Sequence, residues 1–128
     1  MSLTIAERVI PEGTTATYTA TLQDEAGQPV ALASLTSLTL TYYNVADGSI
    51  INSRNAQDVK NANNVTVHAT NGLVTWELQA ADTVIVDSTI ATGRREQHKA
   101  LFTWTWASGA KVGRHEVLIE IKQLAKVS

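Results

Sequence analysis

The residue types that most often bind metals or carry catalysis are few in this chain, and they are not grouped. The three histidines, His68, His98 and His115, share no helical or tight strand spacing with one another or with a cluster of carboxylates. A metal site needs three or four converging ligands, so we expect strand-end or surface histidines and no metal. The chain has no cysteine, which excludes a disulfide framework, a zinc–thiolate site and a thiol nucleophile.

The sequence signals of acyl and phosphoryl transfer are also missing. No serine lies in a Gly-x-Ser-x-Gly elbow, and no glycine-rich phosphate loop occurs. Asp82 and Asp87 lie close together in an expected loop and are conceivable as a general acid/base pair. Capping and solvating a turn is the commoner use of such residues. We therefore predict that the protein is not an enzyme and binds no cofactor.

Aromatic residues alternate along one segment, at Phe102, Trp104 and Trp106, and Trp76 lies in another. They suit either a stacking platform for sugars or bases or the filling of a core. We favour the core, because the opposite face of the same segment offers only a leucine and two threonines. Trp106, nearest the turn at Gly109, is the ring that we expect to reach the surface. The residues that we expect to be buried together are Tyr18, Leu40, Trp76, Phe102, Trp104 and Ile119.

The elements that position these residues are expected to be strands. Apolar and polar residues alternate with a period of two over residues 15–22, 35–43, 73–78, 100–106 and 116–121, which is typical of half-buried strands in antiparallel sheets. Three weaker strands are expected at residues 3–10, 50–54 and 65–68, and a short helical turn within residues 79–86.

Turn residues separate these segments. All seven glycines and both prolines fall between the five strong runs, so none of them interrupts the interior of a strongly alternating strand. Asp47-Gly48 and Ser108-Gly109 have the composition of hairpin turns. The predicted fold is therefore all-β, a single antiparallel two-sheet sandwich of immunoglobulin-like type over residues 1–128, with a barrel as the alternative.

Charge and hydropathy exclude two classes of partner. The net charge is -2, and the only concentration of basic residues, at 94–99, is expected to be a solvated loop, so we predict no nucleic-acid binding. Glu7 and Arg8 interrupt the stretch where a signal peptide needs apolar residues, and no apolar run approaches the ~18 residues of a membrane span. We expect synthesis in a cytoplasm and no membrane partner.

Several motifs occur in the order of a known family. Residues 10–18 belong to a threonine-rich strand. Residues 22–32 contain the turn pattern Asp-x-x-Gly-x-Pro-Val, at residues 24–30, which precedes a strand of leucine and threonine. Residues 72–78 then read Gly-x-Val-x-Trp-x-Leu, and residues 102–121 form a closing pair of strands. This order resembles immunoglobulin-like phage virion domains, of which the N-terminal domain of the siphophage upper baseplate protein family is the nearest example. The chain departs from them by longer insertions at residues 52–64 and 82–95.

The resemblance implies a non-enzymatic structural protein of a tailed-phage virion, which decorates the capsid or completes the neck or tail. Its partners would be capsid, neck or tail subunits, and it would be made in the host cytoplasm and placed in multiple copies in a symmetric assembly. The alternative is a carbohydrate-binding or adhesion module, in which Trp104 or Trp106 stacks on sugars.

The two insertions are where we expect the partner to bind. Residues 52–64 are rich in asparagine and nearly free of large apolar residues, so this segment has little reason to be ordered by itself. The second insertion combines apolar residues with a basic pair, as an interface with an apolar centre and a charged rim does. The alternative is that its apolar residues simply cover one end of the sandwich. The residues that we expect to contact the partner are Val84, Ile85, Ile90, Arg94 and Arg95.

Overall fold

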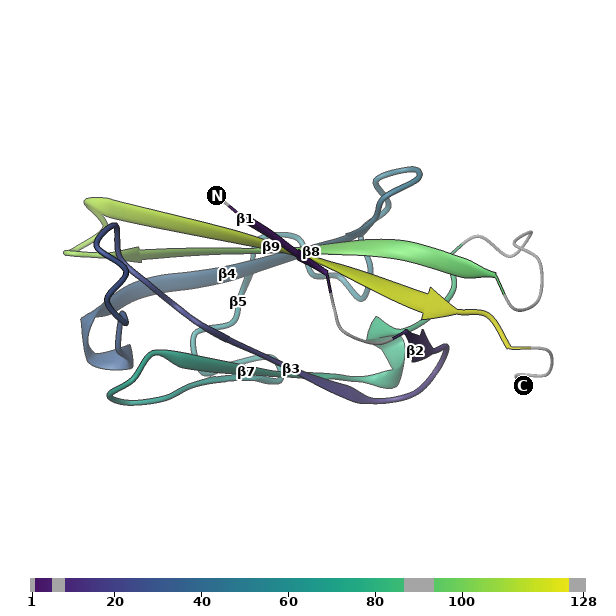
Figure 1. Cartoon of the computed structure of the whole chain (residues 1–128), viewed down its shortest axis with the longest axis horizontal. Coiled ribbons are helices and arrows are strands. Elements are labelled where there is room, and N and C mark those ends of the chain that lie inside the picture. Colours follow the sequence, from purple (N-terminus) through teal and green to yellow (C-terminus); the bar gives the residue numbers. More distant parts are fainter. Residues whose placement is uncertain (1, 6–8, 87–93, 125–128) are drawn as a thin grey trace.

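The computed structural model describes residues 2–5, 9–86 and 94–124, which form two facing β-sheets (Figure 1). The larger sheet has the order β1-β9-β8-β4-β5, with β2 also paired to β9. The smaller sheet has the order β3-β7-β6. These strands are β1 (Ser2–Ile5), β2 (Ile10–Pro11), β3 (Ala16–Thr21), β4 (Leu35–Asn44), β5 (Gln57–Asp58), β6 (Val65–Val67), β7 (Leu73–Leu78), β8 (Arg95–Trp106) and β9 (Lys111–Lys122). The predicted all-β, two-sheet sandwich is confirmed.

Pairing is antiparallel except at the N-terminus. β8 and β9 form a hairpin that begins with Trp106 opposite Lys111, and β3 lies antiparallel to β7 with Tyr18 opposite Trp76. β1 and β2 instead run parallel to β9 along its outer edge. Because the start of the chain lies on the larger sheet, no described strand pairs with the outer edge of β3.

The space between the sheets is filled by the apolar residues of the alternating runs. Five of the six residues expected to be buried together are buried, and Trp76 and Leu40 are fully enclosed. Tyr18 is only half-buried, because its hydroxyl group reaches His115 at the open side of the sandwich. The aromatic rings pack mainly edge to face, as in the pair Trp76–Phe102 with centroids 5.8 Å apart.

One glycine lies inside a strand, so the expectation that all glycines separate strands is wrong. Gly113 is part of β9, opposite Trp104 of β8. A Cβ atom on Gly113 would overlap the indole ring of Trp104. The glycine therefore provides the space in which a large ring lies flat against the neighbouring strand.

Residues 52–64, which by themselves have little reason to be ordered, have a defined structure because contacts with the rest of the sandwich hold them. The backbone of Arg54 accepts a hydrogen bond from Tyr42 N–H at 2.8 Å, and Val59 N–H donates to Leu38 at 2.9 Å. Val59 and Arg54 are both buried. Asparagines in this loop take positive φ, a conformation that asparagine tolerates better than most residues; these are Asn52, Asn61, Asn63 and Asn64.

The remaining short elements follow the prediction in part. Residues 65–67 form β6, whereas Ile50 makes only an isolated bridge with Tyr43. The helical turn expected within residues 79–86 is a 3-10 turn, η2 (Ala80–Asp82), and a second one, η1 (Leu32–Ser34), precedes β4. The turn after Trp106 closes the β8–β9 hairpin with Gly109 at positive φ.

Candidate functional site

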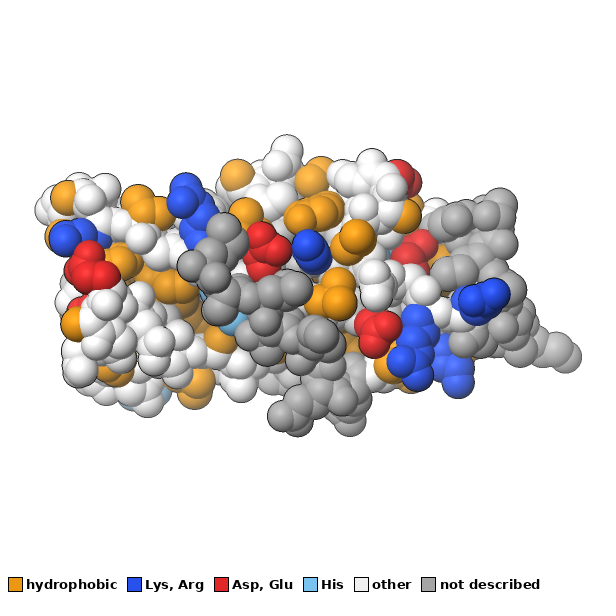
Figure 2. Space-filling view, turned by 45° about the horizontal axis from the view of Figure 1, so that its top comes forward, with side chains coloured by type: hydrophobic (Ala, Val, Ile, Leu, Met, Phe, Trp, Pro, Cys, Tyr) orange, Lys and Arg blue, Asp and Glu red, His pale blue; other side chains and the backbone are white. Residues whose placement is uncertain are grey.

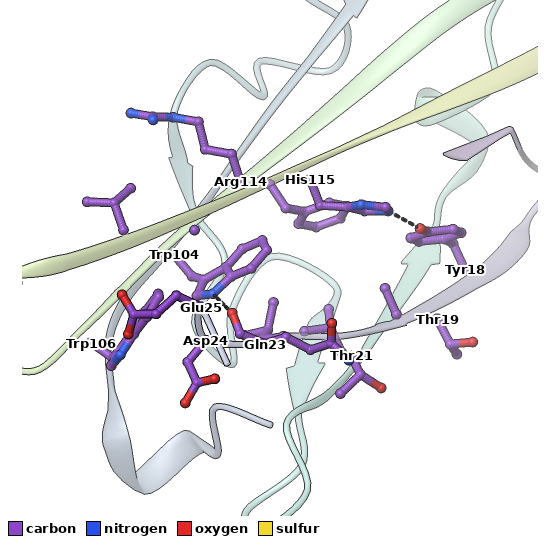
Figure 3. A pocket seen from close by; sticks show the side chains of 16 residues that line it. Tyr18, Thr19, Thr21, Gln23, Asp24, Glu25, Trp104, Trp106, Arg114 and His115 are labelled. Carbon is purple, nitrogen blue, oxygen red and sulfur yellow. Dashed lines mark hydrogen bonds between the residues drawn. The ribbon is translucent and has the colours of Figure 1, made fainter. Parts of the chain in front are cut away.

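A groove of about 820 Å³ opens between β3 and the first part of β9, and we call it the β3–β9 groove (Figure 3). One wall consists of residues 18–25, from β3 and the turn that follows it. The other wall consists of residues 112–115 of β9. Phe102, Trp104 and Trp106 of β8 line it between the two walls. The groove lies where the outer edge of β3 faces β9, and no described strand connects the two sheets there.

The three rings of β8 differ in how far they are enclosed. Phe102 and Trp104 are buried, and the Trp104 indole N–H donates to the Gln23 carbonyl at 3.2 Å. Trp106, next to the hairpin turn, is half-buried. The expectation that Phe102 and Trp104 fill the core is confirmed, and Trp106 is the more exposed ring that a ligand in the groove would contact.

A hydrogen bond between the sheets bounds the inner part of the groove. The hydroxyl oxygen of Tyr18 on β3 lies 2.9 Å from Nε2 of His115 on β9, as Figure 3 shows. Burial raises the pKa of Tyr18 and lowers the pKa of His115. Both groups are therefore uncharged near neutral pH, and the bond holds the sheets together without an ion pair.

The outer part of the groove is polar. Lys111 and Glu25 form an exposed ion pair at 3.1 Å, and Arg114 is exposed beside the groove. The carboxylate of Asp24 accepts hydrogen bonds from Ala26 N–H and Gln28 N–H, both at 2.9 Å. Asp24 thus builds the turn that the Asp-x-x-Gly-x-Pro-Val pattern predicts.

A buried ion pair lies away from this groove. Arg54 Nε is 2.6 Å from Oδ1 of Asp82, and both side chains are almost fully enclosed. Asp82 also accepts a hydrogen bond from Gln79 N–H at 2.8 Å, so its predicted role in capping a turn is confirmed. The expected solvation is wrong, because Arg54 replaces water as the partner of the carboxylate. Asp87, the other half of the conceivable acid/base pair, lies outside the described residues.

A chain of buried polar side chains continues from this ion pair. Tyr42 donates its hydroxyl proton to the Asp82 carbonyl at 2.8 Å, and its oxygen lies 3.2 Å from Nδ1 of His98. Nε2 of His98 is 2.6 Å from Oε1 of Glu96. Burial lowers the pKa of His98, and the hydrogen bond to Glu96 opposes that shift.

The positions of His98 and Glu96 show that two expectations are wrong. His98 is fully enclosed, so it is not a surface histidine; His68 is exposed and His115 is half-buried. The solvated loop expected at residues 94–99 is wrong from Arg95 onward, because β8 begins there. The alternation along β8 indicates that Glu96 and His98 point inward, because they lie on the same face of the strand as Phe102 and Trp104. No spacing signal connects Arg54 with Asp82.

Of the predicted partner residues, Arg94 and Arg95 lie at the start of β8, which is the opposite end of this strand from the groove. Val84 is exposed, and Ile85 is half-buried against the core, where it covers this end of the sandwich. Arg94 and Arg95 are exposed, and Arg95 lies 3.6 Å from Glu120 on β9. Ile90 lies outside the described residues. We call the surface formed by Val84, Arg94 and Arg95 the 84–95 surface.

No protein-family model, curated protein or solved structure matches the chain. Within the described residues, no group of three or more His, Asp or Glu side chains is arranged to hold a metal ion. The helices in the same part of the chain are all too short or too polar to cross a membrane.

Proposed function

We propose that the chain is a non-enzymatic structural protein of a tailed-phage virion, which decorates the capsid or completes the neck or tail through protein–protein contacts. The order of the strands supports the immunoglobulin-like part of this proposal. If β1 to β9 are lettered along the chain, with β1 and β2 as A and β5 as the extra strand C′, the sheets become A-G-F-C-C′ and B-E-D. The G-F-C-C′ and B-E-D orders match those of immunoglobulin sandwiches, and this match supports the proposal.

The observation that carries the proposal is where the family-like motifs fall in the structure. The threonine-rich segment is β3, and the following pattern is the turn held by Asp24. The Gly-x-Val-x-Trp-x-Leu pattern places Gly72 just before β7, the central strand of the smaller sheet. A Cβ atom on Gly72 would lie 2.8 Å from the carbonyl oxygen of Val30, the last residue of the turn pattern. The two motifs thus depend on each other in space, which supports a family resemblance more than either does alone.

The proposed partners are capsid, neck or tail subunits, contacted by several copies in a symmetric array. The β3–β9 groove and the 84–95 surface lie at opposite ends of the sandwich, so one copy can contact two neighbours. Acidic and basic side chains are interspersed on the face drawn in Figure 2, which favours protein contacts over nucleic acid. A chain without cysteine needs no oxidation, which suits folding in the host cytoplasm before incorporation into the particle.

Fractionation of a lysate of phage-producing cells tests the proposal. Particles are banded in a density gradient, and the chain is detected with an antibody. We expect the chain in the particle fraction, where it remains after a wash in high salt. Recovery only at the top of the gradient, with capsid and tail proteins in the particle band, would overturn the proposal.

A second candidate function is carbohydrate binding, which the half-buried ring of Trp106 beside the polar rim of the groove favours. A glycan array probed with the wild type, Trp106→Ala and Val112→Ala separates the candidates. Val112 is an exposed residue of the same groove, so it controls for unspecific surface effects. A glycan signal lost only in Trp106→Ala supports carbohydrate binding, and no signal with the wild type rejects it.

A further inference from the structure

β3 is an edge strand without the usual protection against pairing. Natural sheets protect their edges with charges, prolines, bulges or very short strands. The other described edge strands have two to four residues, whereas β3 has six, Ala-Thr-Tyr-Thr-Ala-Thr, with no charge and no proline. An edge of this kind is suited to pairing with another strand.

The backbone groups that such a strand would need point away from the protein. Leu22 N–H donates to the Gly72 carbonyl at 3.0 Å, which makes residues 22 and 72 a hydrogen-bonded pair in the β3–β7 register. Because such pairs alternate along antiparallel strands, the N–H and C=O groups of Thr17, Thr19 and Thr21 point outward from β7. Among the described residues, none of these groups has a partner strand.

We propose that β3 pairs with β3 of a second copy of this chain, antiparallel, about a two-fold axis at Thr19. This register places Thr19 opposite Thr19 and Thr17 opposite Thr21, so all the outward groups form about six hydrogen bonds. Threonine pairs across strands are favourable. On the inward face the same register places the large ring of Tyr18 opposite the small side chain of Ala20. The sequence of β3 therefore pairs with itself without charge repulsion and with a large side chain opposite a small one.

The arrangement of β1 fits the same axis. β1 pairs with β9 from His115 to Leu118, and no described strand covers the outer edge of β9 at residues 111–114. Because Tyr18 contacts His115, the point on β9 where its covered edge ends and its open edge begins lies next to the axis at Thr19. The two-fold rotation brings β1 of the second copy over the open half, where it covers the outer part of the β3–β9 groove. The two smaller sheets then form one continuous six-stranded sheet.

The inference does not depend on the virion function, because it concerns the purified chain alone. Disulfide trapping tests it directly, since the chain has no cysteine of its own. Hydrogen-bonded residues across antiparallel strands have Cα atoms about 5.5 Å apart, which lies within the range that a disulfide spans. Mild oxidation of Thr19→Cys should therefore give a covalent dimer, detected by non-reducing electrophoresis and by light scattering.

Two further variants test the register. Thr17→Cys and Thr21→Cys should form a mixed dimer with each other, and each should form far less dimer when oxidised alone. Thr66→Cys is the matched control, because Thr66 is an exposed threonine on β6, the other edge of the same sheet. Equal trapping of Thr66→Cys and Thr19→Cys would show random collision and overturn the proposal.

The unmodified edge is tested by light scattering over a range of concentrations. We expect a dimer for the wild type and for Thr66→Lys, and a dissociation constant raised at least about tenfold for Thr19→Lys, because two lysines would meet at the axis. Melting temperatures measured below the wild-type dissociation constant, where every variant is monomeric, should be similar for both variants, since both threonines are exposed. A wild type that stays monomeric at several hundred micromolar, or a dimer equally stable in Thr19→Lys, contradicts the proposal. A monomer that instead binds a glycan or a strand of another protein would assign the edge to that ligand.

Discussion

The guanidinium group of Arg54 and the carboxylate of Asp82 form a two-point contact inside the protein, with Nε 2.6 Å from Oδ1 and Nη2 2.9 Å from Oδ2. The remaining donors of Arg54 reach Gln57 and Asn64 and the backbone carbonyl of Asn63. One buried side chain thus fixes the loop of residues 52–64 against the turn at η2.

Removing one partner of this pair should strongly destabilise the fold. Arg54→Met leaves the Asp82 carboxylate buried with only neutral donors, and we expect a loss of about 3–5 kcal/mol in the free energy of unfolding. Asp82→Asn should also destabilise, and the double variant should lose less than the sum of the two, because neither charge is then left alone. Urea denaturation followed by tryptophan fluorescence measures all three. A loss below 1 kcal/mol for Arg54→Met would contradict this interpretation.

A methyl group at Gly113 should displace the ring of Trp104. We expect Gly113→Ala to cost about 1–3 kcal/mol, as overpacking of a close contact does, and Trp104→Phe in the same chain to recover part of that loss. Val112→Ala is the control, because Val112 is the exposed neighbour of Gly113 on β9. Thermal unfolding of Gly113→Ala, Trp104→Phe, the double variant and Val112→Ala measures the coupling, and purely additive losses would show that Gly113 is not needed for the ring.

The stability of the fold should decrease in mild acid. Burial lowers the pKa of His98 and of His115 from the ordinary value of 6.5, so below that pH the unfolded chain binds more protons than the folded one. The free energy of unfolding therefore falls as the pH drops from about 6.5 through the lowered pKa values. Around His98 the facing groups are Glu96, the hydroxyl of Tyr42 and, through Tyr42, the carbonyl of Asp82.

Substitution identifies the source of this pH dependence. His98→Gln should reduce the slope of stability against pH between 6.5 and 5, and Gln97→Ala, at an exposed position next to it without a titratable group, should leave it unchanged. Chemical denaturation at several pH values measures the slope. The same slope in His98→Gln and the wild type would rule out His98 as a source.

Charge reversal at the 84–95 surface should affect assembly and not folding. Arg95 and Glu120 form a mostly exposed pair at 3.6 Å, and such pairs contribute at most about 1 kcal/mol. We expect Arg94→Glu/Arg95→Glu to melt near the wild-type temperature and to be depleted in purified particles. Wild-type occupancy in particles would show that this surface is not the docking site.

The alternation of residues was sufficient to predict the sandwich. Residues 73–78 were expected as a strand and form β7. The alternation of apolar and polar residues is enough to identify a strand that is buried on one face. The early start of β8 could have been predicted as well, by extending the inward face back from Ala100 through His98 to Glu96. Glu96 and His98 on that face are not apolar, so the alternation of apolar and polar residues is not visible in this part of β8.

Features that depend on distant partners could not be predicted. Arg54 is buried because Asp82, 28 residues away, supplies the opposite charge, and neither residue has a pattern that indicates the other. Gly113 looks like a turn residue until the ring of Trp104 is placed beside it. The open edge of β3 depends on the N-terminal strand lying on β9, a choice between two sheets that local sequence does not determine.

Absolute quantification of the chain by mass spectrometry of purified phage particles measures whether the protein is part of the virion. We expect peptides of this chain in intact particles, in multiple copies that stand in a fixed ratio to the capsid or tail proteins. No peptides from this chain, in particles whose capsid, neck and tail proteins are all detected, would contradict a structural role in the virion.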